Sequence, residues 1–353
     1  MNPEGTGGTG YPDLILSRAP VRINDIGGWT DTWFAGHGRV LNLAAAPGVE
    51  TRIRVSTNPE HRKRRVHMHA RDFGEKFEVD PEAPDLALHP LLQAAVASVP
   101  IPEPVRLEID IGSSVPAGIS VGTSAAVCVS LLGGLCRLMQ TGPSAEEIAR
   151  LAHHVETERL GWQSGIQDQI CAALGGICYI DMSEYPHALI EKLNVPDTVY
   201  AELDLRLDVV YLGSSHNSSA LHEQVIAALE GKEPGFEELQ ELRELPVEAR
   251  SCLLAGDLDG YGETMRRNNA CQKALHPDLV SREAEAVITV AGAHGAGGWK
   301  VNGAGGRGGS LTLLGSPEPG LRTRMRAAIE GMGSGIRILP LRLSRSGLTI
   351  RTQ

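Results

Sequence analysis

The amino-acid sequence predicts an α+β fold built from two domains, and three observations support this prediction. The chain has 353 residues, and domains of roughly 100–200 residues divide that length into two. Within each half, strand-like segments come first and helical segments follow, and no internal repeat is evident. This order favours an α+β protein over a doubly wound sheet. We expect a flexible leader at 1–16, a first domain at 17–195 and a second domain at 196–353.

The first half opens with segments that alternate apolar and polar residues, as half-buried strands do. These predicted strands cover residues 14–23, 49–56, 66–79 with a turn at Gly74, and 105–111. Small and apolar residues then continue from Thr123 to Met139 and include the pair Gly133-Gly134. We expect a buried helix there, whose glycines allow close packing.

The next segment, residues 144–160, carries a helix-start signature. Ser144 and Glu147 have the spacing of a capping box, and Pro143 precedes them. "SGIQDQICAALGG" predicts a short helix that ends at Gly175-Gly176, and "ICYIDM" predicts a strand. The segment 185–203 has no clear period, so we expect it to be irregular and place the domain boundary near residue 195.

The second half begins with a predicted strand at 207–212 and continues mainly with helices. Helices are expected at 219–230, 236–255, 257–274, 281–293 and 318–330, and further strands at 310–315 and 335–343.

Composition and charge favour a small-molecule ligand. A formal net charge of −10 opposes binding to nucleic acid or to an anionic membrane. Six cysteines without paired spacing indicate neither a zinc site nor a disulfide framework. The N-terminal residues do not resemble a signal peptide, and no apolar run of about 18 residues occurs. We expect a cytoplasmic protein, a monomer or homodimer, without nucleic-acid or membrane partners.

The stretch "SSVPAGISVGTSAAV", residues 113–127, follows a predicted strand and opens the helix that begins at Thr123. Exposed backbone N–H groups at such a turn bind anions, because the helix dipole and the unpaired donors both favour negative charge. The hydroxyls of Thr123 and Ser124 could contact phosphate or a hydrated magnesium ion. The loop lacks the lysine of the P-loop pattern, which disfavours that class of NTPase. A plain helix start with small residues is the alternative.

Two further glycine patterns match G-x-G-x-x-G, but neither has the context of a dinucleotide site. Residues 5–10 have no strand before them, and residues 303–308 lie between a helix and a strand, the reverse of the Rossmann order. A dehydrogenase is therefore disfavoured.

Taken together, four motifs resemble those of the GHMP small-molecule kinases. They are "RAPVRINDIGGWTD" (18–31), "PAGISVGTSAAV" (116–127), "ETERLGWQSGIQDQ" (156–169), which is similar to the active-site segment of the sugar kinases, and "KVNGAGGRGG" (300–309). The resemblance spans about residues 17–345. It implies a two-domain GHMP kinase fold with the active site in the interdomain cleft, and ATP and Mg²⁺ as cofactors.

For the reaction itself, the resemblance implies Asp168 as catalytic base and Arg22 beside it as the cation that keeps this carboxylate ionised. Glu156 and Ser124 would hold Mg²⁺. The nucleotide would contact Pro116, Gly118, Ser120, Gly122, Thr123, Ser124 and Ala125. From the residues alone, solvent-exposed positions on a helix or a strand remain the alternative for Asp168, Glu156 and Arg22.

The acceptor pocket implied by the resemblance centres on Asp31, which would accept hydrogen bonds from sugar hydroxyls. The residues expected around the substrate are Asp31, Asn24, Trp29, Gly28, Thr30, His37, His216 and Gly305. A core role for Trp29 and a plain surface role for His37 stay open, as does simple helix capping next to His216. Two residues depart from the family pattern: Ser120 replaces a glycine of the second motif, and Arg307 interrupts the glycine run of the last.

The function expected from this resemblance is ATP-dependent phosphorylation of a sugar at its anomeric hydroxyl. "GGWTDT" is similar to the fucokinase and arabinokinase branch, whereas "MRRNNACQKALHP" resembles the heptose-phosphate kinases, so the acceptor is either an aldose or a heptose phosphate. A non-sugar kinase of the mevalonate or homoserine type and a catalytically silent sugar sensor on the same scaffold are the alternatives.

Overall fold

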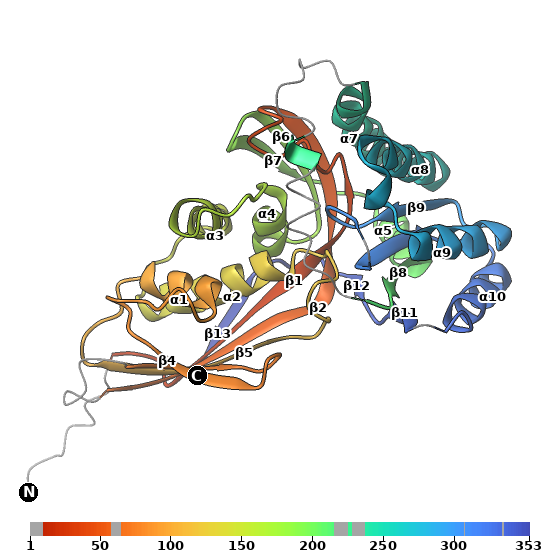
Figure 1. Cartoon of the computed structure of the whole chain (residues 1–353). Coiled ribbons are helices and arrows are strands. Elements are labelled where there is room, and N and C mark those ends of the chain that lie inside the picture. Colours follow the sequence, from red (N-terminus) through yellow and green to blue (C-terminus); the bar gives the residue numbers. More distant parts are fainter. Residues whose placement is uncertain (1–9, 58–64, 215–224, 228–236, 307, 334) are drawn as a thin grey trace, which may run out of the picture.

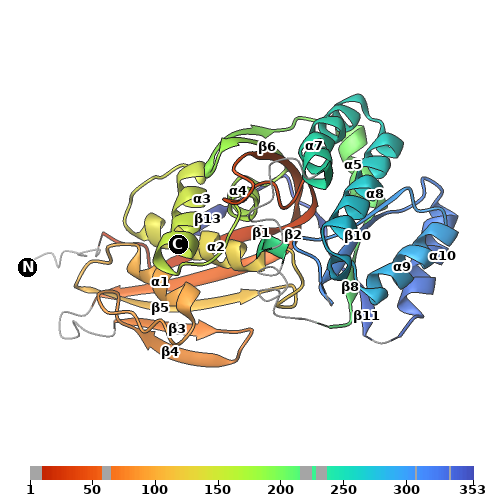
Figure 2. The ribbon, with the colours of Figure 1, turned by 45° about the horizontal axis from the view of Figure 1, so that its top comes forward.

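The computed structural model describes residues 10–57, 65–214, 225–227, 237–306, 308–333 and 335–353. Figure 1 shows a long sheet that carries helices on one face, next to a smaller sheet with helices of its own. Turning the molecule by 45° shows the two parts side by side (Figure 2). This segregated mixture of helices and strands confirms the predicted α+β class.

The larger sheet has nine strands among the described residues. They are β1 (Leu14–Ile26), β2 (Gly38–Thr57), β3 (Val66–Ala70), β4 (Glu75–Val79), β5 (Val105–Ser113), β6 (Ile177–Glu184), β7 (His187–Lys192), β12 (Arg342–Leu343) and β13 (Thr349–Thr352). The main order is β13-β1-β2-β5-β3-β4, with β12 and β6 also paired to β2 and β7 paired to β6. The long strand β2 joins these parts, because residues 38–43 pair with β6 and residues 49–57 with β5.

Strand β1 is irregular at the point where the first motif lies. Its register against β2 shifts between Ala19 and Val21 and again between Ile23 and Ile26. Within the second shift, Asn24 has a left-handed backbone with φ of 48°. The regular alternation of side chains between the two faces of β1 therefore ends after Ile23. Beyond that point, the position of a residue in the sequence does not predict whether it lies on the same face as Arg22.

Helices α1 (Pro90–Ala97), α2 (Thr123–Leu138), α3 (Ala145–His154) and α4 (Gln167–Leu174) lie on one face of this sheet (Figure 1). Helix α2 packs closely through its glycines. A Cβ atom on Gly133 would lie 2.6 Å from Cδ2 of Leu348, and one on Gly134 would lie 2.8 Å from Cδ1 of Ile53. The prediction that these glycines permit close packing is confirmed.

The helix predicted over 144–160 is divided in the structure. Ser144 caps α3, and the reciprocal bonds of the capping box with Glu147 are both present. The five residues that follow α3 form a π-helical turn, η1 (Val155–Arg159). Such turns occur mostly as single insertions and are frequent at functional sites. Glu156, one of the predicted metal ligands, lies in this turn.

The prediction that 185–203 is irregular is wrong. The segment contains β7, which pairs with β6, and most of α5 (Asp197–Arg206). Strand β7 lies at the sheet margin with mostly exposed or half-exposed side chains, and α5 has no side-chain cap at its start. The strand therefore lacks the alternation of apolar residues, and the helix lacks the capping residue, from which such elements are predicted.

The smaller sheet is antiparallel and has the order β11-β8-β10-β9. Its strands are β8 (Leu207–Leu212), β9 (Gly298–Val301), β10 (Ser310–Leu314) and β11 (Ile336–Leu339). The helices that follow in this half are α7 (Glu237–Ala255), α8 (Leu258–Leu275), η2 (Pro277–Leu279), α9 (Arg282–Ala293) and α10 (Pro319–Glu330). Most of the helix predicted at 219–230 lies outside the described residues. Within the described part of the chain, no helix has the length and apolar character needed to cross a bilayer.

The two sheets share much of their buried interior. One hydrophobic cluster runs from β1 and β2 to α7 and α8 and includes Leu242, Tyr261 and Met265. A second cluster, with Val210, Val287 and Met325, lies between the smaller sheet and helices α9 and α10. Segments from the two sheets therefore meet at β1. The domain boundary near residue 195 stays a prediction.

Candidate active site

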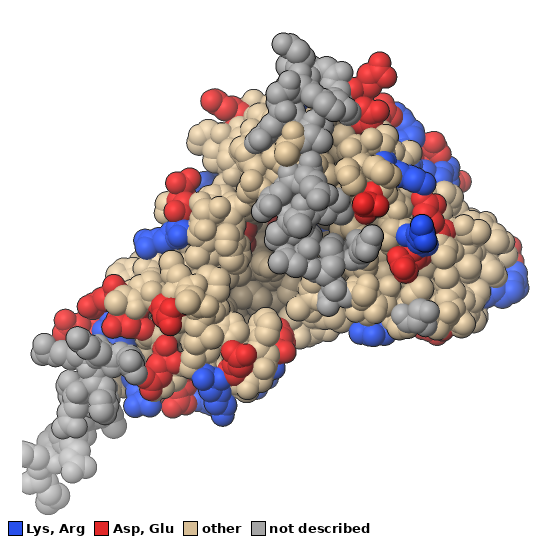
Figure 3. Space-filling view, viewed as in Figure 1, with Lys and Arg blue, Asp and Glu red and all other residues tan. Residues whose placement is uncertain are grey.

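A cavity of about 810 Å³ lies where these segments meet. The space-filling view shows the surface hollowed at the centre of the face seen in Figure 1 (Figure 3). Four stretches far apart in the sequence line the cavity: residues 22–32, 118–125, 156–168 and 303–304 contribute to it. All four motifs singled out in the sequence are thus represented in one cavity.

The first glycine loop forms one wall. Gly118, Ser120 and Gly122 have φ of 71°, 59° and 66°, a left-handed conformation that costs a non-glycine residue about 1–2 kcal/mol. Gly122 is the N-cap of α2, so the following backbone N–H groups are the unpaired donors that bind anions. Gly118, Ser120, Gly122, Thr123, Ser124 and Ala125 line the cavity. Pro116 precedes the loop and is not among the residues that line it.

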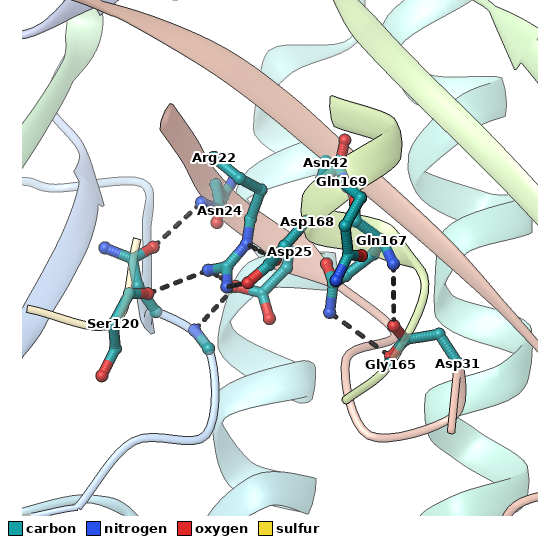
Figure 4. Close-up of polar contacts among 12 residues, drawn as sticks. Arg22, Asn24, Asp25, Asp31, Asn42, Ser120, Gly165, Gln167, Asp168 and Gln169 are labelled. Carbon is teal, nitrogen blue, oxygen red and sulfur yellow. Dashed lines mark hydrogen bonds and ion pairs between the residues drawn. The ribbon is translucent and has the colours of Figure 1, made fainter. Parts of the chain in front are cut away.

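Arg22 and Asp168 form a two-bond ion pair at the edge of this wall (Figure 4). Arg22, on β1, donates from Nε to Oδ1 of Asp168 at 2.7 Å and from Nη2 to Oδ2 at 3.1 Å. The Arg22 side chain is 4% exposed and that of Asp168, on α4, is 28% exposed. Burial opposes the charge of Arg22, but Asp168 and Asp25 outweigh it and raise its pKa. A guanidinium fixed in this way holds a carboxylate that faces the cavity.

Gly122 makes room for that carboxylate. A Cβ atom at this position would lie 2.9 Å from Cγ and 3.0 Å from Oδ2 of Asp168. The glycine therefore permits both the left-handed turn and the close approach of Asp168 to the start of α2.

Asp31 is a buried carboxylate on the opposite wall. It accepts a hydrogen bond from the backbone N–H of Gln167 at 3.1 Å and one from Nε2 of the same residue at 3.4 Å. Burial raises the pKa of Asp31 to about 6, although the Gln167 N–H acts in the other direction. Gly165 allows the approach, since a Cβ there would lie 2.3 Å from Oδ2 of Asp31. Gln167 thus fixes the position of the Asp31 carboxylate, which also lines the cavity.

Glu156 has one satisfied and one unsatisfied oxygen. Oε2 accepts hydrogen bonds from Oγ of Ser164 at 2.6 Å and from Nε2 of Gln169 at 2.7 Å. Oε1 is buried and has no hydrogen-bond partner among the described residues, and the same is true of Oγ1 of Thr123. Burial raises the pKa of Glu156 to about 7. Buried polar atoms are normally paired, so these two oxygens indicate a missing partner.

These residues fit a magnesium ion. Mg²⁺ takes oxygen ligands and is usually held by one or two carboxylates together with substrate phosphates. Glu156, Thr123 and Ser124 line the same cavity and offer a carboxylate and two hydroxyls next to the anion-binding loop.

Several residues predicted around the substrate do not line the cavity. Nδ2 of Asn24 donates to Oη of Tyr261 at 2.7 Å, away from the cavity. Thr30 is buried and its hydroxyl bonds to the carbonyl oxygens of Gly27 and Arg39. His37 lies instead beside a second, smaller cavity of about 290 Å³, together with Arg39 and Asp181.

Two predicted glycines hold the backbone in place rather than facing the cavity. A Cβ on Gly28 would lie 2.5 Å from Oδ2 of Asp25, and one on Gly305 would lie 2.1 Å from the carbonyl oxygen of Leu279. Trp29, by contrast, does line the cavity. His216 and Arg307 lie outside the described residues.

The sequence analysis did not single out Asp25, Lys300 or Trp162. Asp25 also lines the cavity and pairs with Arg22 and with Lys300. Trp162, 41% exposed, lies on the rim of the cavity. All three residues fall inside the quoted motifs, so the signal that could have found them was a charged or aromatic residue within one of those motifs.

Comparison with known proteins agrees with this geometry. Residues 89–176 match the family model described as "GHMP kinases N terminal domain". The chain is 27% identical over 341 residues to the bifunctional fucokinase/GDP-fucose pyrophosphorylase of Arabidopsis thaliana, covering 90% of this chain and 32% of that protein. It therefore spans about a third of that relative's length.

A mevalonate kinase of Pyrococcus horikoshii is 31% identical over 259 residues, which are 70% of this chain and 69% of the relative. Among solved structures, a D-glycero-D-manno-heptose 1-phosphate kinase from Bacteriodes thetaiotaomicron superposes with a TM-score of 0.74 at 18% identity, covering 96% of this chain and 99% of the other. At that identity the likeness shows the fold.

Proposed function

Because the chain belongs to the GHMP kinase family, we propose that it transfers the terminal phosphoryl group of ATP to a hydroxyl of a sugar, with Asp168 as the base. The observation that carries the proposal is the Arg22–Asp168 pair, held beside the anion-binding loop in one cavity. Phosphoryl transfer asks mainly for positioning and charge stabilisation, and this arrangement supports both.

In the proposed reaction, the backbone N–H groups that follow Gly122 bind the phosphates. The carboxylate of Asp168 accepts the proton of the attacking hydroxyl, and the two hydrogen bonds from Arg22 hold that carboxylate in position. Asp31 accepts a hydrogen bond from a second acceptor hydroxyl, so a substrate without that hydroxyl leaves a buried carboxylate unpaired. Glu156 and Ser124 would hold Mg²⁺, which when bound offsets charge on the phosphates.

The charge of the cavity favours a neutral acceptor. Asp25, Asp31, Glu156 and Asp168 line it, and among the described lining residues Arg22 supplies the positive charge. Arg22 already shares its charge between Asp25 and Asp168. A carboxylated or phosphorylated acceptor would meet repulsion there. We therefore place an uncharged aldose before a heptose phosphate.

We further propose the anomeric hydroxyl as the attacking group, because it is the most acidic hydroxyl of an aldose and suits a carboxylate base. The sequence likeness to fucokinase over 90% of this chain agrees with a sugar. The second candidate is a kinase of the mevalonate type, favoured by the identity to the archaeal relative. A silent sugar sensor is disfavoured by the complete Arg22–Asp168 pair.

An acceptor panel tests this proposal. Arabinose, fucose, galactose, a heptose phosphate, mevalonate and homoserine are each incubated with the full chain and Mg-ATP, and ³¹P NMR identifies the product. We expect an anomeric sugar phosphate. Turnover with mevalonate alone would refute the sugar assignment and support the second candidate.

The role of Asp168 is tested with Asp168→Asn. We expect kcat to fall by about 10²–10⁴-fold while ATP binding persists, because the amide cannot accept the proton. The matched control is Asp181→Asn, whose carboxylate also faces an arginine, Arg39 at 3.5 Å, but outside this cavity. Equal activity of the two variants would remove Asp168 from the mechanism.

A further inference from the structure

Four charged side chains form a continuous series of contacts, which runs from the buried Lys300 to three residues that line the cavity, Asp25, Arg22 and Asp168. Nζ of Lys300, on β9, donates to Oδ1 of Asp25 at 3.1 Å. The same oxygen accepts from Nη1 of Arg22 at 3.2 Å, and Arg22 in turn binds Asp168. The series therefore runs from the smaller sheet through β1 to α4. Figure 4 shows its members Arg22, Asp25 and Asp168.

The inner end of this series is closed to solvent. The side chains of Lys300 and Asp25 are both 0% exposed. Besides Asp25, Nζ of Lys300 donates to the carbonyl oxygen of Val301 at 2.7 Å. Burial lowers the pKa of Lys300, and Asp25 acts against that shift. A buried charge without its partner is strongly destabilising, so each of these two groups depends on the other.

Asp25 stands where three segments cross. Its Oδ1 also accepts the backbone N–H of Gly303 at 3.0 Å, which lies in the last glycine motif. Nη1 of Arg22 donates in addition to the carbonyl oxygen of Ser120 at 3.0 Å, which lies in the first glycine loop. The guanidinium is thus divided: Nη1 faces Asp25 and the loop, while Nε and Nη2 face Asp168.

We propose that Asp25 and Lys300 are positioning residues, which fix the guanidinium of Arg22 so that it holds Asp168 in its reactive place. This inference rests on the proposed function, in which Arg22 and Asp168 carry the phosphoryl transfer. The four charges balance as two cations and two carboxylates. Without Lys300, Arg22 alone faces two carboxylates, and Asp25 competes with Asp168 for it.

The physical consequence is a displacement at the reacting centre rather than a loss of binding groups. The side chains of Lys300 and Asp25 are 0% exposed, so their replacement leaves the loop amides, Glu156 and Asp31 available to bind substrate. An interaction that matters mainly in the transition state lowers kcat and leaves KM little changed.

The test is a charge-balanced cycle in the full chain with Lys300→Met, Asp25→Asn and the double variant. Each is assayed with the acceptor that the wild type phosphorylates fastest in the panel above, so a wrong sugar assignment does not affect the comparison. Lys273→Met is the matched control, because Lys273 pairs with Glu285 on the surface. Unfolding curves show that every variant is folded at the assay temperature.

We expect Lys300→Met to lower kcat by about 100-fold, as a displacement near 1 Å at a reacting group does. The KM for ATP and the KM for the acceptor should both stay close to the wild-type values. The double variant restores neutrality and leaves Arg22 to Asp168 alone, so its kcat should exceed that of Lys300→Met by about tenfold or more. If Lys300→Met does not fold, Lys300→Gln takes its place, since the amide still donates to Asp25 without the charge.

Three results would overturn the proposal. The first is a kcat for Lys300→Met equal to that of the Lys273→Met control. The second is a double variant as slow as Lys300→Met, which would reduce the role of the pair to packing. The third is a loss confined to KM. Failure of the proposed function is seen separately, as phosphorylation of a non-sugar acceptor by the wild type.

Discussion

Replacing Gly122 by alanine tests whether the start of α2 sets the position of Asp168, the carboxylate proposed as the base. Gly122 has φ of 66°, so any L-residue there meets conformational strain of about 1–2 kcal/mol. In addition, the new Cβ would lie 2.9 Å from Cγ of Asp168. Carbon atoms in contact prefer about 3.5–4.0 Å, so Asp168 must retreat by about 0.6–1 Å.

The two effects are separated by a control with the same strain and no clash. Gly36 has φ of 70° and no heavy atom within 4 Å of its added Cβ. Gly36→Ala should lose about 1–2 kcal/mol of unfolding free energy from strain, and Gly122→Ala should lose at least as much, because its clash adds to the strain. Only Gly122→Ala should lose kcat, by about 100-fold, because its clash displaces the base.

Denaturant unfolding gives the first quantity, and a coupled assay of ATP consumption with saturating acceptor gives the second. The unfolding curves also show whether both variants are folded at the assay temperature, and if they are, a loss of stability cannot account for a difference in turnover. A Gly122→Ala enzyme with the kcat of Gly36→Ala would refute the view that this glycine places Asp168.

Three further predictions concern other walls of the cavity. The folded-state pKa of Asp31, about 6, lies above its unfolded value, so its contribution favours the folded state below about pH 4 and is lost as pH rises through 6. Asp31→Asn should therefore raise the unfolding free energy at pH 7.5 by about 1–3 kcal/mol, and it should also weaken acceptor binding. A variant no more stable than wild type at that pH would contradict the argument that the raised pKa of Asp31 destabilises the fold. Glu156→Gln should raise the Mg²⁺ concentration for half-maximal activity by about tenfold or more; the opposing result is an unchanged metal requirement in a Mg²⁺ titration. Trp162→Ala should raise the acceptor KM by about tenfold, because an exposed indole on the rim offers an apolar face worth about 1 kcal/mol or more, and steady-state kinetics with an unaltered KM would exclude the contact.

Local signals predicted much of the fold. The capping box at Ser144 could be predicted because both of its hydrogen bonds join residues three positions apart. The glycine pair of α2 could be predicted from the small residues themselves, although Leu348 and Ile53, against which it packs, are distant in the sequence. The elements between 185 and 206 were not, since a marginal strand and an uncapped helix carry little apolar periodicity. What the sequence indicates best is what short-range contacts determine.

The site divides in the same way. Asp168, Arg22, Asp31 and Glu156 were found through motifs, and the structure brings all of them to one cavity. Asn24 was predicted to lie near the substrate, but Asp25 lines the cavity instead. The register shift of β1 between Ile23 and Ile26 interrupts the alternation of side chains at these two residues, so the sequence pattern does not show which of them faces the cavity. The contact between Asp25 and Lys300 joins residues 275 positions apart, and no local pattern encodes such a pairing.

In the larger sheet, β1 and β13 are neighbours although they lie at opposite ends of the described sequence. The backbone N–H of Gln353 donates to the carbonyl oxygen of Leu14 at 2.9 Å, and β13 borders β1 along residues 15–18. On the ribosome, the strand that carries Arg22 emerges long before the partner of its outer edge has been synthesised. Such long-range pairing is slow, and an open strand edge attracts other chains. The edge of β1 that pairs with β13 therefore stays unpaired until β13 has been synthesised. Deleting β13 would leave that edge of β1 permanently exposed.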